Sequence, residues 1–234
     1  MAIARDLPGT SADSSAGTPA RAGMYSEAYV LPLTGKELFT ADEGSYFTAI
    51  SATPGTGIIG HAAPTSFDEA KPYLVLYNGG TKRIYPQFLR LHETVASVGG
   101  AIVQVTITTD VGNRRSSAGT AMTISKARLG GSLSSGAVAF QGAVIGTAAT
   151  GARVIHDHVV FRSTIDIIGD DYEIVFGGLG GGTMTGSRVA TVADFSRTVG
   201  PVVVEPGNSL CITQWVAAQS TGPTWIATLG FIER

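Results

Sequence analysis

Short runs of alternating apolar and polar residues, ended by Gly, Pro or Asn, are the feature of this sequence that most constrains its fold. The clearest run is 101–111, in which Val103, Val105 and Ile107 share one face of a strand and are expected to be buried. Turn residues recur at roughly the 8–12-residue spacing typical of sandwiches and barrels. Long helical patterns that would build a parallel α/β sheet are absent from the sequence. The pattern therefore predicts an all-β fold, an antiparallel β-sandwich or barrel.

A few local elements can be predicted from the same pattern. Asn78 and Gly79 tolerate the positive φ of a tight hairpin between two strands. Pro206 and Gly207 favour a type II turn. Pro86 has no amide hydrogen and should lie at a sheet edge or a bulge. The best helix in the chain is expected at 191–199, although that pattern is short.

The first 30 residues differ from the rest of the chain. They are small, polar and interrupted by Pro and Gly, so they bury too little apolar area to order themselves. We expect residues 1–30 to form an extended or flexible arm, and residues 31–234 to form a single β-sandwich domain. In an assembly, the arm would order on a neighbouring subunit.

Composition limits the partners of the chain. Charged residues make up 15% of the sequence, whereas about 25% is usual, so much of the surface must be neutral. A neutral surface is typical of a protein that is partly covered in an assembly. The net charge of −2 gives no strong field for phosphate backbones, and nucleic acid is not expected as a partner.

Compartment signals favour folding in a cytoplasm. Cys211 is the single cysteine, so no disulfide can form within the chain. The sequence begins MAIARDLPG, without the apolar segment of a secretory signal. No apolar run approaches the roughly 20 residues of a membrane helix, and no membrane association is expected.

The closing stretch, 201–234, carries apolar residues on both faces of its strands. We interpret it as a closing hairpin that packs into the core on one face. On the other face, Ile226, Thr228 and Ile232 are candidates for contact with a neighbouring subunit. The residues expected in the core are Trp225, Ala227, Leu229 and Phe231.

His156 and His158 form the nearest approach to a metal motif. Alternation along a strand would put both imidazoles on one face, within reach of one ion. Further ligands would be needed, and the sequence does not place His61, His92 or the acidic residues beside them. Solvated histidines on a strand face are the commoner arrangement, so no metal is predicted and these two remain the weak candidates.

Other motifs have simpler interpretations. Gly169, Asp170 and Asp171 fit a turn, and the glycine-rich stretch 177–182 lacks the Lys and helix start of a phosphate loop. Cys211 lies in an apolar strand and is expected to be inert core. Arg114 and Arg115 lie in a predicted turn and could contact an acidic neighbour, but they are expected to be solvated. No set of residues resembles a catalytic unit, so we predict neither an enzyme nor a cofactor.

Two segments resemble structural proteins of tailed bacteriophages. These are 54–91, PGTGIIGHAAPTSFDEAKPYLVLYNGGTKRIYPQFLRL, and the closing stretch 201–234, PVVVEPGNSLCITQWVAAQSTGPTWIATLGFIER. The resemblance implies a jelly-roll-like fold of the decoration, cement or fibre-head type, often trimeric. It carries no catalytic residues onto this chain.

The leading hypothesis is a virion protein, assembled in the host cytoplasm, that cements the capsid by bridging neighbouring subunits. Its partners would be the major capsid protein or other virion proteins, and further copies of itself, as a trimer. A second hypothesis is a tail fibre head that binds host glycans, with Tyr25, Tyr29 and Trp225 as scattered aromatic candidates. A third is a metal-dependent enzyme on a β scaffold, supported only by His156 and His158.

Overall fold

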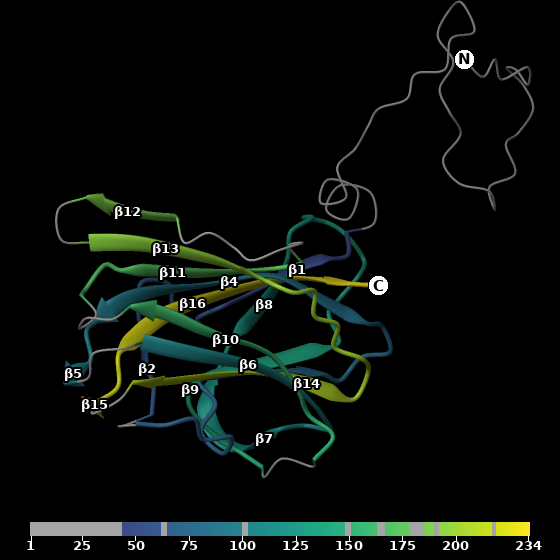
Figure 1. Ribbon diagram of the computed structural model, residues 1–234. Helices are drawn as coiled ribbons and strands as arrows, with labels where there is room; N and C mark the ends of the chain where they lie inside the picture. The colour runs from purple at the N-terminus through teal and green to yellow at the C-terminus, as the bar shows by residue number, and fades with distance from the viewer. Residues whose placement is uncertain are drawn as a thin grey trace, which may run out of the picture. The chain divides into compact units, whose positions relative to one another are not determined.

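The computed structural model describes residues 44–61, 65–99, 103–147, 151–162, 167–177, 185–189, 192–216 and 219–234. The described residues form strands and connecting turns, with no helix among them. Two sheets pack face to face around one apolar core (Figure 1). The predicted all-β sandwich is confirmed. The expected arm, residues 1–30, lies outside the described residues.

The larger sheet contains the central strands β4 (Ile84–Val95) and β16 (Thr224–Glu233), which pair antiparallel along almost their whole length. The short strand β2 (Ile58–Ile59) also pairs with β16. The full order is β12 (Thr185–Val189), β13 (Val192–Val199), β11 (Asp171–Phe176), β4, β16, β1 (Tyr46–Ile50) and β8 (Thr123–Lys126). Strands β11 and β13 run parallel, and the other described pairs run antiparallel.

The smaller sheet has β14 (Asn208–Val216) near its centre, paired with β6 (Val103–Val111) and β3 (Leu74–Asn78). Strands β5 (Val98–Gly99) and β15 (Gln219–Thr221) pair with each other as a separate two-stranded sheet. The full order is β10 (Val154–Arg162), β6, β14, β3, β9 (Ala137–Gly146) and β7 (Arg115–Ala121).

The strand order is that of a jelly roll. Four neighbours in the larger sheet are β1-β16-β4-β11, and four in the smaller sheet are β3-β14-β6-β10. Followed along the chain, these eight strands cross between the sheets as in a double Greek key. Strands β7 to β9 are inserted between β6 and β10, and β12 and β13 are inserted between β11 and β14.

This order corrects the interpretation of 201–234 as a hairpin. Strands β14 and β16 belong to different sheets, and each lies between two other strands. A central strand has no free edge and tends to be buried on the face toward the core and partly covered on the other. The apolar character of this stretch therefore follows first from its place in the fold.

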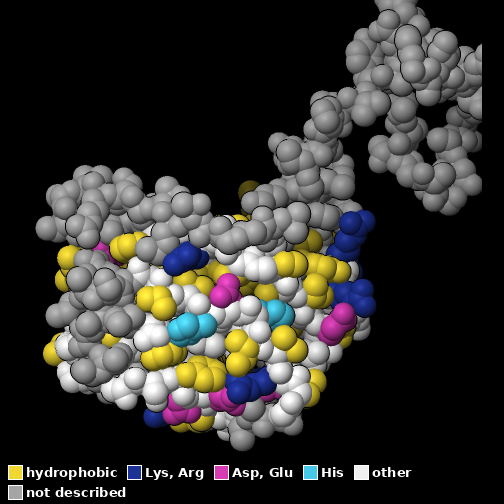
Figure 2. Space-filling view, in the orientation of Figure 1, with side chains coloured by type: hydrophobic (Ala, Val, Ile, Leu, Met, Phe, Trp, Pro, Cys, Tyr) yellow, Lys and Arg dark blue, Asp and Glu magenta, His cyan; other side chains and the backbone are white. Residues whose placement is uncertain are grey.

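The inward faces agree with the alternation in the sequence. Val103, Val105 and Ile107 are buried in the core, and the predicted core residues of β16 are buried too. Figure 2 shows that neutral and apolar side chains predominate on the face it displays, with charged groups scattered among them. The neutral surface expected from composition is visible there.

The expected hairpin at Asn78 and Gly79 is wrong, because β3 and β4 lie in different sheets. The side-chain nitrogen of Asn78, Nδ2, donates hydrogen bonds to the carbonyl oxygens of Lys82 and Val204 at 2.8 and 2.9 Å. Its side-chain oxygen accepts from the Gly80 amide at 3.1 Å. Asn78 thus holds a crossover between sheets, a role that local turn statistics do not contain.

The helix expected at 191–199 is also wrong. Val192–Val199 is strand β13, paired with β11 and β12. Its short helical pattern gives way to pairing with two neighbours, a frequent outcome for weak local propensity. Thr185–Val189, shortly after the glycine-rich stretch 177–182, is also a strand, β12.

Two local predictions are confirmed, a turn at Pro206 and Gly207 and a bulge at Pro86. Gly207 has φ of 80°, and the Asn208 amide donates to the Glu205 carbonyl oxygen at 3.1 Å. Pro86 lies opposite Phe231, next to a register shift between Gly230 and Phe231.

No helix among the described residues is long and apolar enough to cross a membrane.

Candidate functional site

The outward face of the larger sheet is the main candidate for a binding surface. Strand alternation turns every second side chain of β1 and β16 away from the core. Those of β1 and of the first half of β16, up to Thr228, are half-buried. Register places Thr228 beside Ile50, and Tyr46 beside Ile232. We call this surface the β1–β16 face and define it by Tyr46, Thr48, Ile50, Phe88, Ile226 and Thr228. None of its members is charged.

Gly230 lets two aromatic rings close over the middle of the β1–β16 face. A Cβ at this glycine would lie 2.3 Å from Phe88 Cε1 and 2.7 Å from the Tyr46 hydroxyl oxygen. The two rings therefore cover the glycine from neighbouring strands, as aromatic side chains do for exposed glycines in sheets. Partial burial raises the pKa of Tyr46, so its phenol stays neutral over the physiological range.

A small charged cluster borders the β1–β16 face on the side of β11. Arg90 Nη2 lies 3.2 Å from Asp171 Oδ2, and His92 Nδ1 lies 3.0 Å from Asp171 Oδ1. Arg90 remains more than half exposed. An uncharged aromatic and β-branched centre with a polar border is the usual anatomy of a protein interface.

The three interface candidates from the sequence differ in how much surface they offer. Ile226 and Thr228 are half-buried on the β1–β16 face. Ile232 is 5% exposed and already buried within its own chain, so it has little area left for a partner. Tyr46 and Phe88 were missed by the sequence reasoning. Alternation in 46–50 indicates that Tyr46 faces outward, but the register with Gly230 depends on distant pairing.

The candidate metal ligands His156 and His158 make separate contacts. A β-bulge between Ile155 and Asp157 breaks the alternation that would put both imidazoles on one face. His156 Nε2 lies 2.9 Å from the Thr109 hydroxyl oxygen. Burial lowers the pKa of His156, which favours the neutral ring.

His158 lies over polar groups of β6 and one indole. Its Nδ1 lies 3.1 Å from the Thr106 hydroxyl oxygen, and its Nε2 lies 3.0 Å from Gln104 Oε1. Its ring stacks on Trp215 with centroids 5.4 Å apart. Both ring nitrogens thus contact side chains of β6.

The other two histidines lie elsewhere. His61 Nε2 is 2.6 Å from the Val144 carbonyl oxygen, next to the smaller sheet, whereas His92 is on the larger sheet beside Asp171. Across the part of the chain that the structure describes, no group of three His, Cys, Asp or Glu side chains could hold a metal ion.

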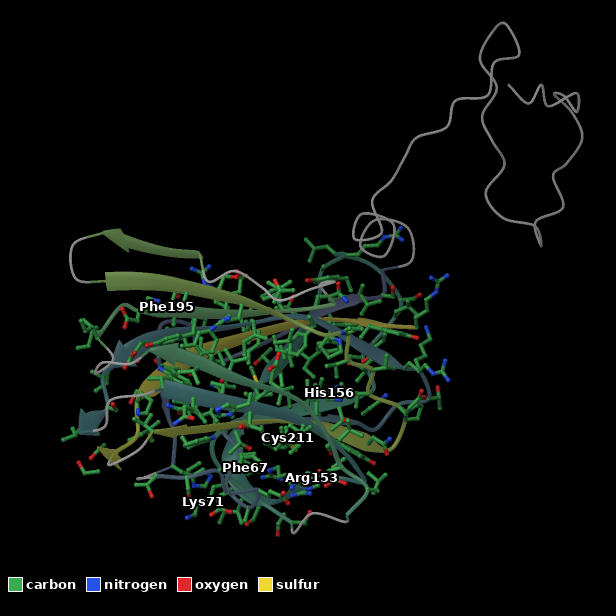
Figure 3. All side chains as sticks on the ribbon, in the orientation of Figure 1. Phe67, Lys71, Arg153, His156, Phe195 and Cys211 are labelled. Carbon is green, nitrogen blue, oxygen red and sulfur yellow. The ribbon has the colours of Figure 1, made fainter. Side chains whose placement is uncertain are left out.

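The middle of the outward face of the smaller sheet, around Cys211, is covered by the chain itself. Figure 3 places Phe67, Lys71 and Arg153 on the side of that sheet away from the larger one, near Cys211. Arg153 pairs with Glu69, and its guanidinium lies 5.5 Å from the centroid of the Phe67 ring. This layer covers the outward-facing Val75 and Val144 beside Cys211, whereas Val138 of β9 and Val160 of β10 remain 45% and 40% exposed.

Arg114 corrects the expectation of a solvated turn. It is buried, forms an ion pair with the buried Asp110, and donates to the carbonyl oxygens of Glu69 and Thr147. Cys211 is buried in β14, as predicted, and burial raises its pKa to about 12. A thiol of this kind is protonated and shielded, which fits an inert residue.

The remaining candidates can also be placed. The Asp170 backbone amide donates a hydrogen bond to the Ile167 carbonyl oxygen at 3.0 Å, and Asp171 is the first residue of β11. The acidic pair therefore lies in the expected turn before a strand. Trp225, proposed for glycan binding, is fully buried in the core and cannot contact a glycan. Tyr25 and Tyr29 lie outside the described residues.

Comparison with protein-family models, curated proteins and solved structures found no match.

Proposed function

We propose that this chain is a non-enzymatic structural protein of a tailed-phage virion, assembled in the host cytoplasm, that cements the capsid. It bridges neighbouring capsid subunits and is itself oligomeric, as a trimer. The observation that carries the proposal is the β1–β16 face, an uncharged, partly exposed surface on the larger sheet.

The physical argument concerns what a cement protein requires. A jelly roll fixes the relative positions of its strands through a shared core, so it can hold two neighbours at a defined separation. Tyr46, Phe88 and Arg90 belong to residue types that are enriched at interfaces. A specific contact should bury more than about 1,000 Å², with apolar area contributing roughly 25 cal/mol per Å² before the cost of association.

Co-sedimentation with expanded heads of the phage that encodes the chain tests this proposal. Ile226→Asp puts a charge into the middle of the β1–β16 face, where an interface cannot hydrate it, and should weaken head binding at least tenfold. Ile168→Asp is the matched control, because Ile168 is exposed in a turn outside this face. Circular dichroism should show both variants folded.

Electron microscopy of the intact virion provides the second readout. Density for this chain should lie on the capsid between neighbouring subunits, with the larger sheet toward a partner. Density on the tail, or a monomer that does not bind expanded heads, would contradict the proposal and favour the fibre-head alternative. Glycan-array binding would be the measurement that supports that alternative.

A further inference from the structure

Two cavities of about 450 and 190 Å³ share a wall at one end of the larger sheet. Phe47, Leu133 and Ser134 line both of them. Ile124, Lys126 and Leu129 also line the larger cavity, and Lys82 and Glu233 also line the smaller one. We call the combined hollow the Phe47 groove. The larger part falls within the size range of sites that bind small ligands or single side chains.

The walls of the groove are held in place by the fold. Phe47, its floor, is buried and stacks on Phe231 with centroids 5.9 Å apart. The Lys126 ammonium group donates a hydrogen bond to the Gly131 carbonyl oxygen, and this bond fixes one side of the loop that follows β8. The groove is therefore formed before any partner binds, which lowers the entropic cost of binding.

Glu233 anchors the other side of that loop. Its carboxylate accepts hydrogen bonds from the Ser135 hydroxyl and, at 3.3 Å, from the Gly136 amide. Gly136 also packs on Gly80, where an added Cβ would lie 2.5 Å from the Gly80 Cα. The carboxylate of Glu233 is thus occupied by hydrogen bonds within the chain.

Apolar side chains at the groove are exposed to solvent. Leu129 is 92% exposed and Leu133 is 36% exposed, in a loop that is otherwise small and polar. Leu129 is the most exposed of the large hydrophobic side chains among the described residues. A partner that covered it would gain apolar burial that the free chain does not have.

Two lysines and one glutamate line the groove, so the charged side chains of its lining are positive on balance. The lysines are Lys82 and Lys126, and the glutamate is Glu233. Arg83, Arg128 and Arg234 belong to the adjoining segments. Of the acidic groups near them, Glu205 pairs with Arg83 and Glu233 is bonded to the loop. Figure 2 shows Lys and Arg side chains gathered at the end of the described body where Figure 1 places the C-terminus.

We infer that the Phe47 groove is a docking site for an extended acidic segment of a partner protein that carries an apolar side chain. The apolar side chain enters between Ile124, Leu129 and Leu133, above Phe47. Carboxylates on either side of it meet Lys82 and Lys126. Charge complementarity argues for an acidic partner, and the apolar lining requires an apolar anchor. The inference does not depend on the virion assignment.

A peptide titration of the isotope-labelled full chain by NMR tests this site. The probe is the blocked hexapeptide Asp-Glu-Leu-Phe-Asp-Glu. We expect it to bind with Kd below about 1 mM and to shift the amide resonances of Phe47, Ile124 and Leu133. Two comparison peptides should not bind: one with glycines in place of the apolar pair, and one with lysines in place of the acids.

Variants distinguish the groove from a nonspecific charge effect. Leu129→Ser should weaken the binding about tenfold, because it removes an apolar contact of roughly one side chain. Ile168→Ser, also at an exposed apolar residue, should leave it unchanged. Lys82→Glu should weaken binding up to about fivefold, the range of one exposed ion pair. Lys71→Glu, at an exposed lysine paired with Asp68, is its control.

Several outcomes would overturn the inference. One is the absence of any shift at millimolar acidic peptide. Another is equal binding of the lysine peptide. A third is saturable binding of dodecanoate to the groove with no binding of the peptide, which would mark a site for small amphiphiles. Head binding tests the β1–β16 face, whereas the peptide titration tests the Phe47 groove. A failure of head binding alone would therefore contradict the proposed function and not the peptide site.

Discussion

The hydroxyl of Tyr73 donates a hydrogen bond to the carbonyl oxygen of Trp225 at 3.2 Å, and their rings meet edge to face with centroids 5.2 Å apart. Tyr73 directly precedes β3 in the smaller sheet, whereas Trp225 belongs to β16 in the larger one. Both side chains are buried. This contact ties the two sheets together across the core, between residues far apart in the sequence.

Tyr73→Phe should lower the free energy of unfolding by about 1–2 kcal/mol, because the ring is kept while a buried hydrogen bond is lost. Urea denaturation followed by tryptophan fluorescence measures the change. Tyr77→Phe is the matched control, since Tyr77 is half-buried and its hydroxyl makes no hydrogen bond to another described residue. Equal losses in both variants would contradict the proposed role of the hydroxyl.

Gly230→Ala should destabilise the fold by about 1–3 kcal/mol, because its methyl group would overlap the rings of Phe88 and Tyr46. Phe88→Ala removes one of those rings. In the double variant, the cost of Gly230→Ala should therefore fall by more than half, a coupling expected of residues in contact. Thermal and urea unfolding of the four proteins give the coupling energy. Strict additivity would show that the rings do not set the requirement for glycine.

Arg114→Met should cost about 3–5 kcal/mol, because it removes the cation that pairs with the buried Asp110 carboxylate. Replacing both partners, with Arg114→Met and Asp110→Leu, should cost less than the single change. Arg83→Met breaks the exposed pair with Glu205 and should have little effect on unfolding. Urea midpoints at pH 7 compare the variants.

Cys211 should contribute a loss of stability at alkaline pH. Burial raises its pKa to about 12 in the folded chain from a usual value of 9.0, so the folded state holds the proton longer than the unfolded state. The stabilisation is full below pH 9 and is lost as pH rises toward 12. Between neutral pH and pH 10.5, the free energy of unfolding of the wild-type chain should fall by about 2 kcal/mol more than that of the Cys211→Ala variant.

Thiol labelling with Ellman's reagent at pH 8 provides an independent check on Cys211. The folded chain should react only as fast as it opens, and the unfolded chain should react at once. Rapid labelling under native conditions would contradict its burial in β14.

His156 should act in the opposite pH range. Burial lowers its pKa in the folded chain, so the unfolded chain takes up the proton first as pH falls. Stability should therefore decrease below about pH 6.5, near the usual pKa of histidine. His156→Gln should reduce this acid loss, measured from urea midpoints between pH 5 and 7.5. An unchanged slope would show that another group titrates.

The sequence predicted the strands well and their partners poorly. Alternation in 103–107 and 225–231 identified the core faces, because the direction of a side chain along a strand is a local property. The supposed hairpins at Asn78 and at 201–234 failed, because strand pairing depends on segments that are distant in the chain.

The candidate sites follow the same division. The sequence contains the uncharged alternation of β1 and β16, which made Ile226 and Thr228 candidates. It does not reveal that Ile232 is already covered, that a bulge separates the contacts of His156 and His158, or that Arg114 is buried. Each of these depends on what other segments bring to that place.

What the sequence by itself determined is the class of this protein: strands, turns and a neutral surface, all set by residues acting on their near neighbours. Only the tertiary structure decided that β14 and β16 are central strands of opposite sheets, and that Phe47, Leu129 and Leu133 enclose a groove. The physical reason is that burial and pairing are collective, since the position of one strand is fixed by the strands packed around it.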